Sequence, residues 1–298
     1  VMNPEIAALR ALFTAKPRPT DWPERRQRMD EICAVDPPPA DVVYTPAAVG
    51  AIPAEWSLAP GADATRVLLY LHGGGYCSGS IASHRGLVGR IGREAGIRTL
   101  ALGYRLAPEN PCPAALLDAL AAYGFLRSEG YEPEQIVVGG DSAGGGLTLA
   151  TLLALREEGS PMPAGAWLVS PWVDLAMTGA SMEEEDAIDP LIHGDYLRGL
   201  AGAYLGGRDA RDERASPLYA DLAGMPPTLV QVGSSETLLD DAVRVTRRLG
   251  AAAARVDLEI WPEMIHAWML WAPRLEAGRA ASTTASAFLR ARLKPEKP

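Results

Sequence analysis

The most informative stretch of this chain is Ile136-Val137-Val138-Gly139-Gly140-Asp141-Ser142-Ala143-Gly144. Its three aliphatic residues predict a buried strand, and the apolar run over 143–156 predicts a helix directly after it. Glycines flank Ser142 at the spacing of a tight strand-to-helix turn, where the strained backbone excludes larger side chains and presents the serine hydroxyl at the helix N-terminus. Alone, this pattern could also be an ordinary glycine-rich loop. In its strand and helix context it predicts a nucleophile at Ser142.

Similar short aliphatic runs occur on both sides of this stretch, each followed by a helix-length segment. They cover residues 67–71, 99–102, 166–169, 228–232 and 256–261, and two earlier runs, 42–44 and 55–58, are joined by a segment containing Pro and Gly. Continuous apolar runs are typical of strands buried on both faces, and intervening helices suit right-handed parallel crossovers. The sequence therefore predicts an α/β fold with a mostly parallel sheet of about eight strands flanked by helices.

Two segments do not follow this alternation. Residues 1–40 contain two proline-rich stretches, and residues from about 176 to 215 interrupt the strand and helix pattern. We expect both to fold as helices over the open end of the sheet and to form a small cap. The catalytic domain is then expected over 41–298, with 1–40 as the first part of the cap and about 176–215 as the second.

Composition and charge exclude several classes of protein. The net charge of −9 leaves no excess of Lys and Arg to follow a phosphate backbone, so no nucleic acid partner is expected. Residues 1–16 lack the pattern of a signal peptide, and the longest apolar stretch, 147–155, is too short to cross a bilayer, so we expect a cytoplasmic protein without a membrane partner. The three widely spaced cysteines predict plain thiols and offer no metal site.

A second glycine motif, His72-Gly73-Gly74-Gly75, follows the run 67–71. Consecutive glycines let backbone NH groups approach a substrate carbonyl and stabilise the anionic tetrahedral intermediate. The NH group of Ala143, directly after the nucleophile, is expected to be another donor. A glycine run by itself could be a flexible turn. The two motifs together, in this order, indicate an oxyanion hole.

A serine nucleophile needs a histidine base, and the chain has four histidines. His72 belongs to the glycine motif and is expected to orient that loop. His84 lies at the start of the next helix, and His193 falls in the second cap segment. His266 follows the last predicted strand, which fits the chain order of nucleophile, acid and histidine. We predict that His266 is the base.

The acid is expected after the run 228–232, where Glu236, Asp240 and Asp241 are all candidates by position. Asp240 and Asp241 fall where a helix begins, so they can equally serve as helix caps. Glu236 lies in the preceding loop and is the better candidate for the third member of a Ser-His-Glu triad.

The sequence resembles the bacterial hormone-sensitive-lipase-like esterases (family IV) of the α/β-hydrolase superfamily. The likeness rests on a set of motifs in order: residues 72–75, 104–109, 113–115, 140–144, 170–172, 216–218 and 236–240. The resemblance implies that Gly74 and Gly75 supply the oxyanion-hole NH groups. The family's usual acid motif is Asp-Pro-Leu-x-Asp, whereas residues 236–240 here read Glu-Thr-Leu-Leu-Asp. The family commonly has glycine and phenylalanine after the histidine, where this chain has Ala267 and Trp268.

The expected function is that of a serine carboxylesterase acting through an acyl-enzyme, with a small-molecule ester as substrate and no metal or organic cofactor. We expect Tyr76, Trp172 and Trp268 to narrow the pocket and favour short acyl chains. The resemblance also implies a homodimer paired near 256–261. Two alternatives stay open: an amide or formamide hydrolase on the same triad, and a non-catalytic receptor, because the fold also resembles plant hormone receptors with a broken triad.

Overall fold

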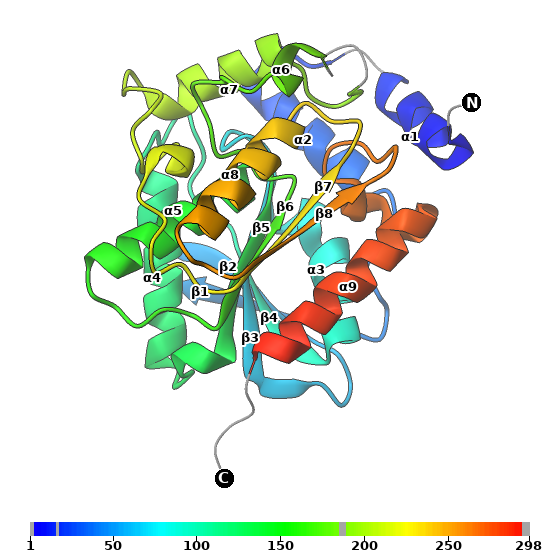
Figure 1. Ribbon diagram of the computed structural model, residues 1–298. Helices are drawn as coiled ribbons and strands as arrows, with labels where there is room; N and C mark the ends of the chain where they lie inside the picture. The colour runs from blue at the N-terminus through cyan, green and yellow to red at the C-terminus, as the bar shows by residue number, and fades with distance from the viewer. Residues whose placement is uncertain (1–2, 16–17, 185–188, 294–298) are drawn as a thin grey trace.

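An eight-stranded sheet forms the centre of the molecule (Figure 1). The computed structural model describes residues 3–15, 18–184 and 189–293. Strands follow the order β1-β2-β4-β3-β5-β6-β7-β8; β2 is antiparallel to its neighbours β1 and β4, and all other pairs are parallel. The strands are β1 Val43–Val49, β2 Ile52–Leu58, β3 Asp63–Leu71, β4 Ile97–Leu102, β5 Ile136–Asp141, β6 Gly165–Val169, β7 Thr228–Gly233 and β8 Val256–Trp261. The predicted α/β fold with a mostly parallel sheet is confirmed.

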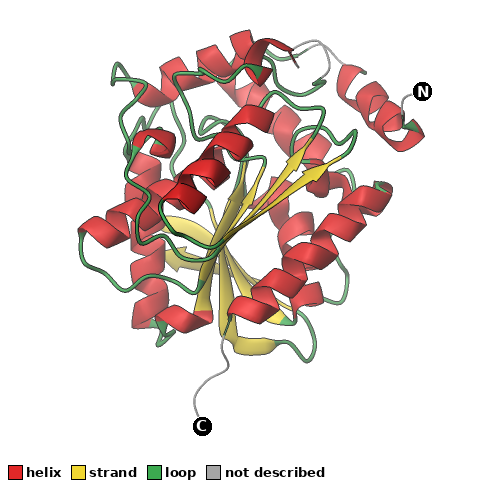
Figure 2. Ribbon diagram, in the orientation of Figure 1, coloured by secondary structure: helices red, strands yellow, loops and turns green. Residues whose placement is uncertain are grey.

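Helices cover both faces of this sheet, which gives three layers (Figure 2). The helices are α1 Pro4–Thr14, α2 Trp22–Cys33, α3 Ile81–Ala95, α4 Ala114–Ser128, α5 Ala143–Glu157, α6 Ser181–Glu184, α7 Gly194–Leu205, α8 Leu239–Ala251 and α9 Glu276–Arg292, with short 3-10 helices η1 Pro133–Gln135, η2 Pro217–Tyr219 and η3 Trp268–Arg274. Helices α3 and α9 share one apolar cluster on one face. On the other face α4 and α5 pack together, and α5 shares a second cluster with α8.

The first two strands are longer than their sequence suggests. Apolar runs predict strands only at 42–44 and 55–58, whereas β1 and β2 form a hairpin that continues to the pair Val49 and Ile52. Pro46 lies inside β1, which disfavours a strand prediction there. Because β1 is the edge of the sheet, a residue without an NH donor is tolerated at that position.

The helix boundaries follow local capping signals. The Asp21 side chain accepts from the NH of Glu24 and starts α2. Ser80 and Ser83 form a reciprocal capping box at the start of α3. Gly206, with a left-handed φ of 58°, ends α7. These are the residue types that cap helices elsewhere.

The two segments outside the strand and helix alternation lie above the carboxyl ends of the strands (Figure 1). They carry α1 and α2 in one and α6 and α7 in the other; residues 16–17 and 185–188 lie outside the described residues. Arg26 fastens α2 by donating from Nε to the Cys77 carbonyl at 2.9 Å and by pairing with Glu109. At the other end of α2, Trp271 donates to the Ile32 carbonyl at 2.7 Å.

Candidate active site

Ser142 lies in the tight turn between β5 and α5. Its φ and ψ are 54° and −122°, a conformation that side chains rarely adopt. Backbone bonds hold it: its NH donates to the Val169 carbonyl at 2.8 Å, and its carbonyl accepts from the Trp172 NH at 2.9 Å. A Cβ added at Gly144 would lie 1.9 Å from the Leu71 carbonyl oxygen, so the turn requires glycine there. The predicted strained turn is present.

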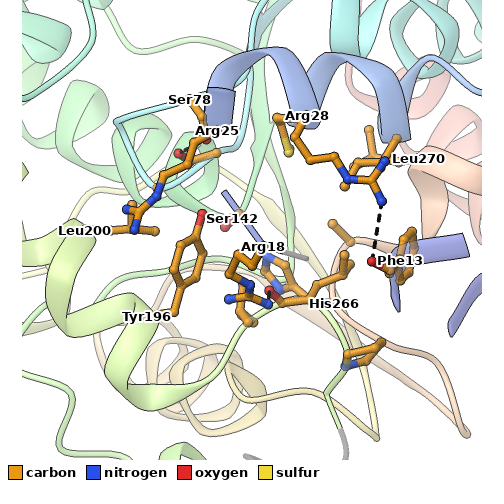
Figure 3. Close-up of a pocket in the computed structure, with 18 of the residues that line it drawn as sticks. Phe13, Arg18, Arg25, Arg28, Ser78, Ser142, Tyr196, Leu200, His266 and Leu270 are labelled. Carbon is orange, nitrogen blue, oxygen red and sulfur yellow. Dashed lines mark hydrogen bonds between the residues drawn. The ribbon is translucent and has the colours of Figure 1, made fainter. Parts of the chain in front are cut away.

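His266 and Glu236 meet at the carboxyl ends of β8 and β7. His266 Nδ1 lies 3.2 Å from Glu236 Oε1, and both side chains are buried. The other carboxylate oxygen, Oε2, accepts from Ser170 Oγ at 2.7 Å and from the Gly233 NH at 2.9 Å. Glu236 is therefore held by two donors that fix which of its oxygens faces the imidazole. Ser142 and His266 line the same cavity (Figure 3).

The charges around His266 favour its protonated form. Burial lowers the pKa of His266, but the hydrogen bond and charge of Glu236, together with the charges of Asp189 and Asp141, raise it above its ordinary value. Asp189 accepts from the NH groups of Leu191 at 2.9 Å and Thr237 at 3.2 Å. It thereby joins the loop after α6 to the residue beside Glu236. Burial raises the pKa of Asp189 to about 6.

The other two acid candidates have structural partners. Asp240 Oδ2 accepts from the NH groups of Ala180 at 2.5 Å and Ser181 at 3.2 Å, so it caps α6 rather than its own helix. Asp241 is fully buried, and its Oδ2 accepts from the NH groups of Val173 and Asp174 at 2.9 and 3.0 Å. Burial raises the pKa of Asp241 to about 8. Among the three candidates, Glu236 is the one hydrogen-bonded to His266.

The glycine motif lies beside the nucleophile. Gly74 and Gly75 have φ angles of 113° and 63°, and a Cβ added at Gly74 would lie 2.3 Å from the Ser78 carbonyl oxygen. Within the described part of the chain, the NH groups of Gly74, Gly75 and Ala143 donate to no protein acceptor. Gly74, Gly75 and Ser142 all line the cavity that holds His266. These NH groups are thus available to a bound substrate.

Asp141 connects the glycine motif to the nucleophile turn. Its Oδ1 accepts from the Gly73 NH at 2.9 Å and from the Tyr70 hydroxyl at 2.8 Å, and His84 Nε2 lies 3.1 Å away. Burial raises the pKa of Asp141, but His84 and the Tyr70 hydrogen bond lower it by more, so its pKa lies below the ordinary value. The sequence identified His84 only as a residue near a helix start. No local pattern shows that it reaches Asp141.

His72 contacts the glycine motif of which it is part. Its Nδ1 lies 2.8 Å from the Gly73 oxygen, and its ring stacks on Tyr104 with 4.2 Å between centroids. Burial lowers the pKa of His72 to about 3, so it is neutral near pH 7. His193 caps α7 by accepting from the Tyr196 NH at 3.3 Å. Neither histidine competes with His266 for a place beside Glu236.

The cavity above Ser142 has a volume of about 140 Å³. Its walls come from the end of α1, residues 18–19, α2, the loop 190–192, α7 and the start of η3. Tyr76, Trp172 and Trp268, which the sequence suggested as walls, are not part of this lining. Each is at most 1% exposed and lies in the apolar core; Tyr76, for example, stacks on Tyr204 with 3.7 Å between centroids. Residues from 13–32 and 190–200 line the cavity where these rings were expected.

The chain matches the family model described as the alpha/beta hydrolase fold over residues 68–270. A crystal structure of an esterase from the bacterial hormone-sensitive lipase family superimposes with a TM-score of 0.96 at 44% identity, covering 99% of this chain and 100% of the other. The chain belongs to the bacterial hormone-sensitive-lipase family of α/β-hydrolases. It is an ester hydrolase of that family.

Relatives of this esterase have consistent names. An acetyl-hydrolase of Streptomyces hygroscopicus is 48% identical over 253 residues, which cover 85% of this chain and 83% of the relative. An esterase of Acinetobacter venetianus is 33% identical over 250 residues, covering 82% of each chain. The resemblance inferred from the motifs is therefore confirmed along most of the chain.

The esterase departs from its family's acid motif without losing the contact to histidine, because the Glu236 carboxylate lies within hydrogen-bonding distance of His266. None of its helices, within the part of the chain that the structure describes, is long and apolar enough to cross a membrane. In those same residues, no three His, Cys, Asp or Glu side chains gather in a way that could hold a metal ion. Cys33, Cys77 and Cys112 are buried free thiols.

Proposed function

We propose that this esterase hydrolyses short-acyl carboxylic esters through an acyl-enzyme, with Ser142 as nucleophile, His266 as general base and Glu236 as the acid that orients the base. One observation carries the proposal. Ser142 and His266 share a cavity, and the buried Glu236 carboxylate lies 3.2 Å from His266 Nδ1, which leaves Nε2 as the imidazole nitrogen free to serve as the base. This arrangement matches the roles in a serine hydrolase triad.

In the first half of the reaction, the Ser142 hydroxyl attacks the ester carbonyl while His266 Nε2 accepts its proton. The protonated His266 then donates that proton to the departing alcohol, which leaves an acyl-enzyme on Ser142. In the second half, water attacks the acyl carbonyl while His266 takes its proton; the Ser142 Oγ–acyl bond then breaks, the carboxylic acid leaves, and His266 returns the proton to Ser142 Oγ. Glu236 holds the tautomer with a proton on Nδ1 and stabilises the imidazolium.

Gly74, Gly75 and Ala143 are proposed to donate the oxyanion-hole hydrogen bonds. Their NH groups have no acceptor among the described residues, and the Asp141 carboxylate links the loop that carries the two glycines to the turn that carries Ala143. Donors fixed in this way need no reorganisation when charge develops on the substrate oxygen. Removal of one such donor typically costs about 10²- to 10³-fold in kcat.

The size of the cavity supports a small acyl group. A volume of about 140 Å³ is close to that of an engineered apolar cavity of ~150 Å³ that accepts benzene. We therefore propose acyl chains of roughly two to six carbons, within the small end of ligand pockets. The name of the Streptomyces acetyl-hydrolase agrees with this range. Residues 1–40 and about 176–215 are proposed to act together as the cap that limits the cavity.

We also propose that the esterase forms a homodimer through the β8 edge. Among the strands that the structure describes, β8 has a neighbour on one side only. On it, Ile260 is 47% exposed, and Val243 of the adjacent α8 is 36% exposed. An uncovered strand edge with apolar side chains is a typical pairing surface.

The proposal is tested by labelling with a fluorophosphonate followed by peptide mass spectrometry. We expect one adduct, on the peptide that contains Ser142, together with loss of 4-nitrophenyl butyrate hydrolysis. Ser142→Ala should abolish both labelling and turnover. An aryl formamide assayed beside the ester distinguishes an amide hydrolase on the same residues. Full turnover by Ser142→Ala, or an adduct on another residue, would contradict the proposed nucleophile.

A further inference from the structure

Two arginines line the cavity without a carboxylate partner. Arg18 and Arg25 both belong to its wall. No Asp or Glu oxygen lies within 4.0 Å of either guanidinium group, as far as the described residues go. Neighbouring arginines of the same segment do have such partners: Arg26 pairs with Glu109, and Arg28 lies 3.7 Å from Glu31. Among the described residues, no carboxylate therefore neutralises these two positive charges at the cavity, in a chain whose net charge is −9.

Groups other than carboxylates hold these two arginines in place. Arg18 donates from Nη2 to the Leu191 carbonyl at 2.7 Å, its Nη1 lies 3.2 Å from His193 Nε2, and its guanidinium carbon lies 4.4 Å from the centre of the Tyr196 ring. Arg25 donates from Nε to the Pro19 carbonyl at 3.1 Å, and its guanidinium carbon lies 5.5 Å from the same ring. Figure 3 shows the two side chains on either side of Tyr196. The contacts orient both groups without cancelling their charge.

The contact of Arg25 with Pro19 occupies only its Nε donor. The two Nη groups of Arg25 donate to no acceptor in the described ranges 3–15, 18–184 and 189–293. Guanidinium nitrogens in this state are suited to a carboxylate, which can accept two parallel hydrogen bonds. Among the described residues of this wall, Asp141 is the one carboxylate, and it is buried and already accepts hydrogen bonds from Tyr70 and Gly73.

We infer that the preferred substrates are esters that carry a carboxylate away from the scissile bond, bound by Arg18 and Arg25. The inference rests on the proposed function and names its substrate class: monoesters of short dicarboxylic acids, or short-acyl esters of hydroxy acids. The reaction stays a hydrolysis, in which water is added across the ester bond and the second carboxylate is unchanged. Arg18 and Arg25 touch that carboxylate and determine specificity; they take no part in bond breaking.

The test compares matched anionic and neutral esters. Monoethyl glutarate and its neutral analogue ethyl glutaramate place the charge on the acyl side, with released ethanol measured enzymatically. Butyryloxyacetate and butyryloxyacetamide place it on the alcohol side, with released butyrate measured. We expect kcat/KM to be about tenfold or more higher for the anionic member of one pair, the effect of about one charge-assisted hydrogen bond. Addition of 0.5 M NaCl should reduce this ratio because salt screens partly exposed charges.

Variants assign the preference to the arginines. In Arg25→Gln the ratio of anionic to neutral kcat/KM should fall about tenfold, and Arg25→Lys should restore part of it because the charge returns without the planar fork. The double variant Arg18→Gln/Arg25→Gln should bring the ratio to about one. Arg247→Gln is the matched control, because it removes one exposed positive charge on α8 outside the cavity wall. It should leave the ratio unchanged, and circular dichroism confirms that each variant folds.

Failure of this inference differs from failure of the proposed function. Hydrolysis of the neutral esters with an anionic to neutral ratio at or below one in both pairs overturns the inference and leaves the esterase intact. A high ratio that survives the double arginine substitution also overturns it. Absence of turnover on all four esters and on 4-nitrophenyl butyrate, by contrast, overturns the proposed function itself.

Discussion

Replacement of Glu236 by glutamine tests the third member of the proposed triad. Oε2 accepts from the Gly233 NH and from Ser170 Oγ, so the amide oxygen of glutamine must occupy that position. Its NH₂ group then faces His266 Nδ1, 3.2 Å away in the native protein. Because an NH₂ group can only donate there, His266 is forced into the tautomer with its proton on Nε2. That tautomer cannot accept the proton of Ser142.

The expected magnitude follows from this change of tautomer. A comparable acid-to-amide change in a serine protease lowers kcat about 10⁴-fold, and we expect a fall on the order of 10³ to 10⁴ for Glu236→Gln. Steady-state hydrolysis of 4-nitrophenyl butyrate measures it, after circular dichroism and melting confirm the fold. The KM should change little, since Glu236 is fully buried and outside the cavity wall.

Asp240→Asn is the matched control. Asp240 Oδ2 accepts from two backbone NH groups, and an amide oxygen can accept from both. Its turnover should therefore stay within a few-fold of the native value. Near-normal turnover of Glu236→Gln together with an inactive Asp240→Asn would show that Glu236 is not the triad acid, which would then lie four residues further along the chain.

Three further predictions concern the pH profile, the cavity and the assembly. Nearby carboxylates raise the pKa of His266, and His266 must be neutral to act as the base. We therefore expect kcat/KM to rise with pH through a midpoint above the ordinary histidine pKa of about 6.5. Asp189→Asn removes one of these negative charges and should lower that midpoint. A midpoint unchanged by Asp189→Asn contradicts this assignment. Leu200→Ala removes a buried side chain from the cavity wall, so the acyl length with the highest kcat/KM in a series of 4-nitrophenyl esters should increase. The free energy of unfolding should fall by about 2–5 kcal/mol. If the native protein prefers acyl chains of ten carbons or more, the cavity does not limit acyl length. Light scattering at micromolar concentration should give the mass of a dimer, and Ile260→Asp should shift it to 31.6 kDa; a native monomer excludes the β8 interface.

Much of the candidate site could be read from the chain because its parts are local. The turn that holds Ser142 needs glycine at fixed spacing, and the chain shows that spacing directly. His266 could be selected because only four histidines exist and one follows the last strand. Glu236 was harder to select, since three carboxylates follow the end of β7 within eight residues. The hydrogen bonds of Asp240 and Asp241 to other segments separate them from Glu236.

The network around Asp141 and the walls of the cavity could not be found in the same way. His84 lies 57 residues before Asp141 in the chain, and no short spacing signals their contact. Large aromatic residues near a catalytic motif suggest the wall of a substrate pocket. They also bury more apolar area than other side chains, which stabilises them in the core. Tyr76, Trp172 and Trp268 lie in the core and not in the cavity wall.

The α/β fold and the residues proposed for nucleophile and base could be predicted from the chain alone, because apolar periodicity and glycine spacing act over a few residues. The family followed from the resemblance of an ordered set of short motifs. The tertiary structure alone decided which carboxylate meets His266 and which residues enclose the substrate. Arg18 and Arg25 precede Ser142 by more than a hundred residues, and their meeting with it depends on how α2 and α7 pack above the sheet. Contacts between distant segments depend on the geometry of the whole chain, and no local pattern encodes that geometry.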